Sequence, residues 1–105
     1  MKQMTIIVKP FRAEAVLKAL EEMDLTPSCV VREVRGYSRQ KGYLDQYLGS
    51  EYSDVFLPKV EIVVSVEDHR VEQVAERVEQ VARTGRMGDG KIFVMSLAWS
   101  EALEF

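Results

Sequence analysis

The densest group of residues that could bind a phosphate lies in the run RTGRMGDGK, Arg83–Lys91. Three glycines, Gly85, Gly88 and Gly90, are interspersed there with arginine and lysine. Glycines let a backbone approach an oxyanion closely and turn its N–H groups toward it. Arginine and lysine add charge-assisted hydrogen bonds to phosphate oxygens. The composition of the run therefore favours phosphate binding, although glycines alone more often mark a plain turn between a helix and a strand.

The spacing from Gly85 to Gly90 and Lys91 imitates the P-loop of nucleotide triphosphatases. Two features exclude that motif. Ile92 stands where a serine or threonine would meet magnesium, and the run follows a predicted helix and leads into a predicted strand, which is the reverse of the P-loop order. No Ser-His-Asp, Cys-His or paired-carboxylate arrangement stands out in the sequence. We therefore predict a binding protein and not an enzyme.

A second unusual segment runs from Ser38 to Leu57. It lacks apolar periodicity and contains three tyrosines, Tyr43, Tyr47 and Tyr52. A loop of this length inside a compact domain is uncommon and is usually functional or mobile. Tyrosine is enriched at the energetically dominant positions of protein interfaces. We therefore predict that this segment docks on a partner protein.

The elements that must position these segments follow from the hydrophobic pattern. Strands are predicted at residues 4–8, 30–37, 60–66 and 91–98, and helices at residues 12–23 and 68–82. The order β-α-β-β-α-β is the ferredoxin-like arrangement of the α+β class, with the long loop between the second and third strands. Both helices should cover one face of an antiparallel sheet. The other face then needs cover, which favours a homo-oligomer whose sheets face inward.

Two glycines have predicted structural roles. Gly36 lies inside the second strand, where a glycine indicates a bulge or a close approach of other atoms. Gly85 follows the second predicted helix, at the position where a left-handed residue commonly ends a helix.

The composition indicates one folded domain. The chain has 105 residues, 47% of them hydrophobic and 30% charged, and its net charge of −3 argues against general nucleic-acid binding. A single cysteine, Cys29, excludes an internal disulfide and does not support a cysteine-based metal site. No apolar stretch approaches the roughly 18 residues that would span a membrane. The first apolar run is cut by Lys9 and Pro10, so no signal peptide is predicted. We expect a cytoplasmic protein.

Several motifs together resemble the PII signal-transduction family of nitrogen regulatory proteins. Residues 83–94, RTGRMGDGKIFV, resemble its nucleotide-binding B-loop. Residues 36–42, GYSRQKG, resemble the start of its T-loop, while YLGSEY at 47–52 and FLPK at 56–59 resemble the rest of that loop. With IVKPF at residues 7–11, the resemblance runs from about residue 2 to residue 95.

The resemblance implies a single PII-like domain over residues 1–105, with a T-loop at about 38–57 and a B-loop at about 83–91. It implies a homotrimer that binds an adenine nucleotide in each cleft between subunits. The residues it assigns to the nucleotide are Gly36, Tyr37, Ser38, Arg39, Val63, Thr84, Gly85, Arg86, Met87, Gly88, Asp89, Gly90 and Lys91. Those it assigns to an anionic effector, 2-oxoglutarate in many members, are Gln40, Lys41, Gly42 and Lys59.

The resemblance also implies how the signal is passed on. Gln40 matches the residue that helps to hold magnesium when ATP is bound. Tyr52 matches the tyrosine that is uridylylated in some proteobacterial members. The nucleotide state would set the conformation of the T-loop, which would dock on a membrane transporter or a metabolic enzyme.

Two departures from the family pattern bear on the nucleotide. Ser38 replaces the second glycine at the start of the T-loop, and serine resists the backbone conformations that glycine permits. No arginine follows Arg86, whereas family members carry an R-x-R pair that reaches the ATP phosphates; Glu101 and Glu104 stand in this part of the chain. A charged hydrogen bond contributes about 1.5–3 kcal/mol. The loss of two predicts a preference for ADP or AMP over ATP.

The same departures leave an alternative. Some PII-like proteins associated with carboxysomes or bicarbonate transport have short C-termini and sense bicarbonate together with ADP or AMP. This chain could belong to that branch of carbon metabolism, with Arg39, Gln40 and Lys59 binding the smaller anion.

Overall fold

The structure is a computed structural model, and it describes residues 1–39, 54–86 and 88–98. The strands are β1 (Lys2–Val8), β2 (Val30–Arg39), β3 (Asp54–Val66) and β4 (Gly90–Ser96), and the helices are α1 (Pro10–Glu22) and α3 (Val71–Ala82). Short 3₁₀ turns, η1 (Thr26–Ser28) and η3 (Asp68–Arg70), precede β2 and α3. The order of the strands and the two long helices is the βαββαβ order that the hydrophobic pattern predicts.

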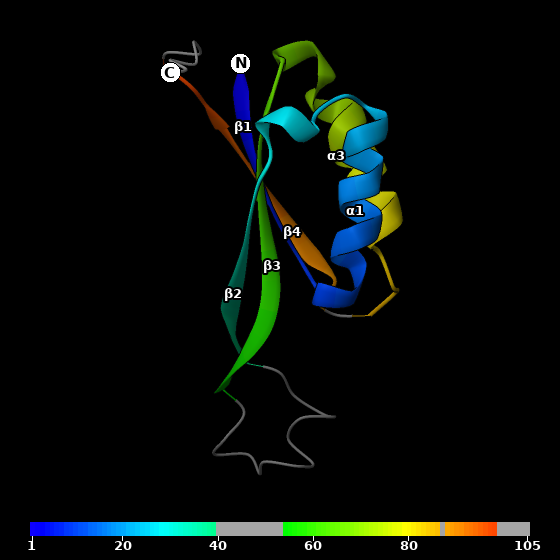
Figure 1. The fold of residues 1–105 in the computed structure, drawn as a ribbon. Coiled ribbons are helices and arrows are strands. Elements are labelled where there is room, and N and C mark those ends of the chain that lie inside the picture. Colours follow the sequence, from blue (N-terminus) through cyan, green and yellow to red (C-terminus); the bar gives the residue numbers. More distant parts are fainter. Residues whose placement is uncertain (40–53, 87, 99–105) are drawn as a thin grey trace.

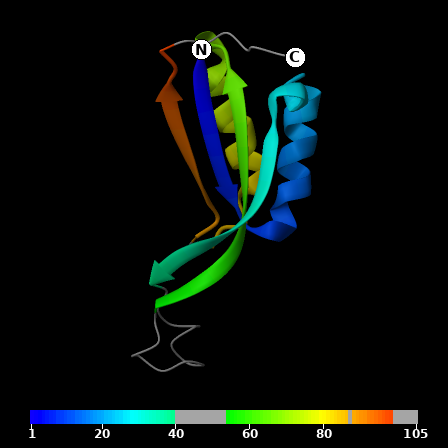
Figure 2. The same ribbon diagram turned by 60° about the vertical axis from the view of Figure 1, so that its left-hand side comes forward.

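The four described strands form one antiparallel sheet in the order β2-β3-β1-β4. Both helices pack on the same face of the sheet, and the β2–β3 hairpin continues well beyond the ends of the helices (Figures 1 and 2). The ferredoxin-like α+β fold is therefore confirmed. The beginning of β4 and the end of β1 lie side by side, at the end of the sheet from which the hairpin extends.

The core lies between the sheet and the two helices. Met4, Ile6 and Val8 alternate along β1 and are fully buried, because every second residue of a strand points to the same face. β3 contributes Ile62, Val64 and Val66, and the helices contribute Ala13, Val16, Leu20, Val74, Val78 and Ala82. Each large apolar side chain buried in this way contributes about 1.5–3 kcal/mol.

β2 and β3 are longer than the sequence pattern predicts. Pairing runs without a break from Val30 opposite Val63 to Arg39 opposite Asp54, so both ends of the predicted 38–57 loop belong to strands. The break in the hydrophobic pattern has a physical reason at Pro58. β1 pairs with β3 only as far as Val60, so Pro58 has a neighbouring strand on one side only, where a proline without an N–H is tolerated.

The predicted end of the second helix at residue 82 is confirmed, but the predicted role of Gly85 at its C′ position is wrong. The helix ends at Ala82, and Arg83 is already extended, with φ −72° and ψ 130°. The backbone N–H of Arg83 still donates to the carbonyl of Glu79 at 3.1 Å. Gly85 has φ +84°, but it uses this left-handed conformation to turn the loop that follows.

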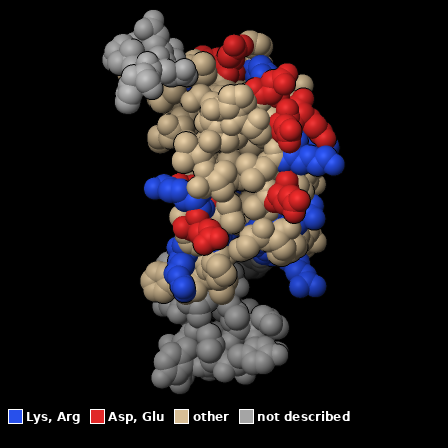
Figure 3. Space-filling model, viewed as in Figure 1, with Lys and Arg blue, Asp and Glu red and all other residues tan. Residues whose placement is uncertain are grey.

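The face of the sheet opposite the helices carries a mixture of apolar and polar side chains. Phe93 and Met95 of β4 and Val30 of β2 are about half exposed there, at 51%, 53% and 58%. In the view of Figure 3, uncharged side chains cover the middle of the molecule, and most charged ones lie on the helix side and around the lower end. An exposed apolar group of this kind is compatible with the predicted packing of sheets in an oligomer.

Candidate functional site

The glycine-rich loop of residues 83–91 connects α3 to β4 beside the junction of β1 and α1. The antiparallel register places Val8 opposite Gly90, so that Lys9, the next residue along the chain, meets Asp89. Met87 lies outside the described residues. The rest of the loop has a defined internal structure, organised around a single side chain.

That side chain is Asp89, whose carboxylate is turned into the loop. Its Oδ2 atom accepts hydrogen bonds from the backbone N–H groups of Thr84, Gly85 and Arg86 at 2.7, 2.9 and 3.2 Å. Its Oδ1 atom accepts one from the Thr84 hydroxyl. These bonds, led by that from the Thr84 hydroxyl, hold the pKa of the Asp89 carboxyl well below its usual range. The Asp89 carboxylate is therefore anionic and already accepts hydrogen bonds from its own loop.

Lys9 adds an ion pair to this arrangement. Its Nζ atom lies 3.2 Å from Oδ1 of Asp89, and the two side chains are only 20% and 19% exposed. Gly90 brings the loop still closer to β1. A Cβ atom at Gly90 would lie 3.0 Å from the carbonyl oxygen of Ile7 and 3.3 Å from a methyl carbon of Val8. The glycine is thus required where the backbones of β1 and β4 approach at the site.

Lys59 reaches the loop from β3. Its Nζ atom donates a hydrogen bond to the carbonyl oxygen of Gly88 at 3.0 Å. Its aliphatic stem crosses Gly36 of β2, where an added Cβ would come within 3.2 Å of the Lys59 Cγ atom. Gly36 therefore marks a close approach and not a bulge, because the β2–β3 pairing is continuous there.

The surroundings of Lys59 disfavour its charged form. Partial burial lowers the pKa of Lys59, and the nearby cations Lys9 and Lys91 lower it further, while Asp89 acts in the opposite sense. Asp89 is already paired with Lys9. Lys59 and Lys91, together with the exposed Arg86 in the loop itself, can therefore offer charge to an incoming anion. A bound anion would relieve their mutual repulsion.

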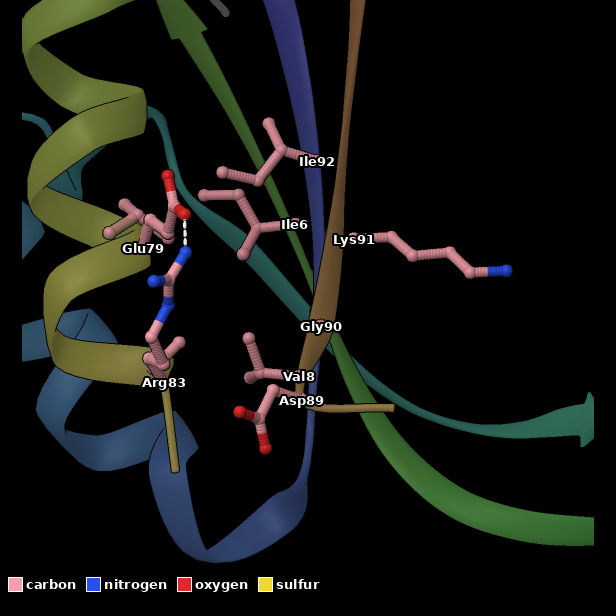
Figure 4. A pocket seen from close by; sticks show the side chains of 10 residues that line it. Ile6, Val8, Glu79, Arg83, Asp89, Gly90, Lys91 and Ile92 are labelled. Atoms are coloured by element: carbon pink, nitrogen blue, oxygen red, sulfur yellow. Dashed lines mark hydrogen bonds and ion pairs between the residues drawn. The ribbon is translucent and has the colours of Figure 1, made fainter. Parts of the chain in front are cut away.

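Several of the residues assigned by sequence share one face of the sheet. Lys91 lies opposite Ile7, and Ile7 lies opposite Glu61, so all three point to the face without helices. Lys59 and Val63 flank Glu61 at alternate positions and point the same way. Figure 4 shows Lys91 pointing away from α3, whereas Arg83 and Glu79 lie on the α3 side of the sheet, joined by an ion pair.

A pocket of about 290 Å³ opens on the α3 side of the loop. Its floor is apolar and its rim is charged (Figure 4). The lining residues are Ile6, Val8, Val78, Glu79, Ala82, Arg83, Asp89, Gly90, Lys91 and Ile92. Lys91 borders the pocket, but its side chain points away from α3, toward the face that carries Lys59 (Figure 4). The pocket and the side chains of Lys59 and Lys91 therefore offer a ligand two places on opposite faces of the sheet.

The remaining residues assigned by sequence fall outside this description. Gln40, Lys41, Gly42 and Tyr52 lie outside the described residues, as do the side chains of Tyr37, Ser38 and Arg39.

Sequence reasoning missed Lys9. The signal was available in the predicted topology, because an antiparallel pair formed by the first and last strands brings the residue after β1 beside the residue before β4.

Comparison with known proteins identifies the family. The profile of the family described as "Nitrogen regulatory protein P-II" matches residues 1–102. The chain belongs to the P-II family. Nitrogen regulatory protein P-II of Rhodospirillum rubrum and nitrogen regulatory protein GlnK of Escherichia coli are each 46% identical to it over 97 residues, which is 92% of this chain and 86% of theirs. The P-II protein of Azospirillum brasilense is 48% identical over 94 residues, 90% of this chain and 83% of its own.

The matches confirm the resemblance to nitrogen regulatory PII proteins. These P-II and GlnK relatives are named as regulators of nitrogen, which favours a nitrogen regulatory signalling protein over the carbon-sensor alternative. In the part of the chain that the structure describes, no helix has the length and apolarity needed to cross a membrane. Over the same residues, no group of three or more His, Cys, Asp or Glu side chains is placed to hold a metal ion.

Proposed function

We propose that this P-II protein binds an adenine nucleotide against residues 83–91 and reports it to a partner transporter or enzyme through residues 38–57. The observation that carries the proposal is the position of Lys59 and Lys91 on one face of the sheet beside a loop whose glycines allow close backbone approach. Two cations beside such a loop favour a phosphate. Membership of a regulatory family supports a signalling role for the bound nucleotide.

The proposal includes a homotrimer with one nucleotide in each cleft between subunits. The face that carries Lys91 also exposes the apolar side chains of Phe93 and Met95. A second copy that covers this face would bury those side chains and enclose the nucleotide beside the lysines. Exclusion of water would strengthen the interaction between lysine and phosphate. The mass in solution, measured by light scattering with and without ADP, tests this step.

The preferred nucleotide is proposed to be ADP or AMP, with ATP weaker or equal. Residues 87–105 contain no arginine, and Glu101 and Glu104 bring negative charge into this segment. The terminal phosphate of ATP would then lack two charged partners, each contributing about 1.5–3 kcal/mol. We expect calorimetric titrations with AMP, ADP and ATP plus magnesium to give the tightest binding for ADP or AMP. Binding of ATP tenfold tighter than either would contradict this preference.

The proposed second ligand is a small dianion, 2-oxoglutarate, bound beside Lys59. Its other proposed contacts are Gln40, Lys41 and Gly42. Gln40 is also proposed to hold magnesium when ATP is present. Titration with 2-oxoglutarate or bicarbonate, each with saturating ADP or Mg-ATP, separates the two candidate effectors.

Uridylylation of Tyr52 is a further proposal. Mass analysis of protein exposed to a uridylyltransferase extract, with Tyr52→Phe as the control, tests it.

The affinity for the anionic effector should fall at an unusually low alkaline pH. The anion binds the charged form of Lys59. Because the pKa of Lys59 is lowered, the lysine loses its proton before the pH reaches the ordinary lysine pKa of about 10.4. Titrations across this range should show the loss in the wild-type protein. Lys59→Arg keeps its charge and should not show it. An identical alkaline loss in both proteins would rule out Lys59 as the group that titrates.

A further inference from the structure

We propose that Asp89 is a positioning residue of the nucleotide site and that Lys9 holds it in place. The Asp89 carboxylate gathers the backbone of Thr84–Arg86 around itself and so sets the direction in which Gly88–Lys91 meets the phosphate. This inference deepens the proposed function and depends on it for the identity of the ligand. It gives Asp89 a role inside the loop and not a direct contact between its side chain and the nucleotide.

The first argument is the number of donors that Asp89 already has. A carboxylate offers about four lone-pair positions on its two oxygens. Five donors point at this one: the N–H groups of Thr84, Gly85 and Arg86, the Thr84 hydroxyl and the Lys9 ammonium. A ribose hydroxyl or a magnesium ion could reach the Asp89 side chain only by displacing some of them.

The second argument is charge. A carboxylate beside a phosphate would repel it unless a cation offsets the charge. Lys9 supplies that cation at 3.2 Å, in a pair of which both members are largely shielded from solvent. The three backbone N–H groups also stabilise the carboxylate within the loop. Because Lys9 neutralises Asp89, the charges of Lys59 and Lys91 remain available to attract the phosphate of the ligand.

The third argument is where Lys9 is anchored. It stands between β1, which pairs with β4 up to Gly90, and Pro10, which begins α1. The lysine therefore extends from a part of the backbone fixed on both sides. Its bond to Asp89 ties the β1–α1 junction to the α3–β4 loop. A residue fixed in this way can hold the loop in one conformation before the ligand arrives.

The test compares loop order and ligand binding in the full-length protein. The variants are Asp89→Asn, Lys9→Met and the double variant. Lys18→Met removes an exposed lysine of α1 and serves as the matched control. Amide hydrogen exchange of residues 84–86 is measured without ligand, and the dissociation constant for ADP is measured by calorimetry.

The inference expects a specific pattern in both measurements. In the ligand-free protein, Asp89→Asn should speed amide exchange of residues 84–86 by about tenfold, because their acceptor is weakened. Lys9→Met should have the same effect to a smaller degree. Asp89→Asn should also weaken ADP binding about tenfold, and the double variant should be no more than about twofold worse than Asp89→Asn alone, because both residues act through the same contact.

Three results would overturn the inference. These are unchanged exchange of residues 84–86 in Asp89→Asn, unchanged ADP affinity in both single variants, and additive losses in the double variant, which would mean separate roles. If Asp89→Asn does not fold, Thr84→Val and Lys9→Met carry the same two measurements. Failure of the wild-type protein to bind any adenine nucleotide would instead reject the proposed function, and the exchange data would still decide whether Asp89 organises the loop.

Discussion

Replacing Gly90 with valine is expected to lower the free energy of unfolding by about 3 kcal/mol and to abolish nucleotide binding. A Cβ atom at this position would lie 3.0 Å from the carbonyl oxygen of Ile7, and a backbone atom within a paired strand cannot move aside as a flexible side chain can. The Cγ1 atom of Val8, at 3.3 Å, blocks the same space. The first residue of β4 would have to leave β1, and Lys91 would move with it.

The matched control for this variant is Gly85→Ala, in the same loop. Nothing lies within 4 Å of a Cβ at Gly85, so only its left-handed φ of +84° opposes the substitution. That strain is about 1 kcal/mol for a non-glycine residue. Chemical denaturation and calorimetry with ADP measure both effects. Equal stability losses in Gly90→Val and Gly85→Ala would show that close approach to β1 is not what Gly90 provides.

The order and type of the main elements could be predicted because the hydrophobic pattern is strong in each of them. Met4, Ile6 and Val8 repeat at strand spacing, and Val74 and Val78 at helix spacing, and all five are buried as expected. The ends of the elements could not be predicted equally well. The β2–β3 hairpin continues past Pro58, where β3 pairs with β2 but no longer with β1. No local pattern in the sequence indicates this continued pairing.

The candidate residues could be selected from the sequence, but the interactions of their side chains with the rest of the protein could not be predicted. The composition of the glycine-rich loop indicates phosphate binding, and the family resemblance assigns Asp89 to the nucleotide. Neither reports that the Asp89 carboxylate accepts hydrogen bonds from its own loop. Lys9 is far from the loop in sequence, and the predicted topology places only the end of the first strand near the start of the last one. Only the register that sets Val8 opposite Gly90 brings the two together, and a register is a property of paired strands.

Lys91 and Arg83 flank the same loop on opposite faces of the sheet, and exchanging each for methionine will show which face binds the nucleotide. We expect Lys91→Met to weaken ADP binding by about 10- to 100-fold, as the loss of one charged hydrogen bond of about 1.5–3 kcal/mol predicts. Arg83→Met should change the affinity less than threefold, because the Arg83 guanidinium is paired with Glu79 on the α3 side. Both side chains are exposed, so neither change should alter stability by more than about 0.5 kcal/mol.

The comparison of these two variants decides between the two candidate places for the ligand. Lys91 shares its face with Lys59 and with the apolar side chain of Phe93, which a second subunit could cover. Arg83 lines the pocket together with Val78 and Ile92. If Arg83→Met lost the greater affinity, the nucleotide would lie in that pocket, within one subunit, and the proposal of a site between subunits would have to be given up. A Lys91→Arg variant that retains most of the affinity would complete the case for a phosphate on the helix-free face, since it keeps the charge and changes the shape.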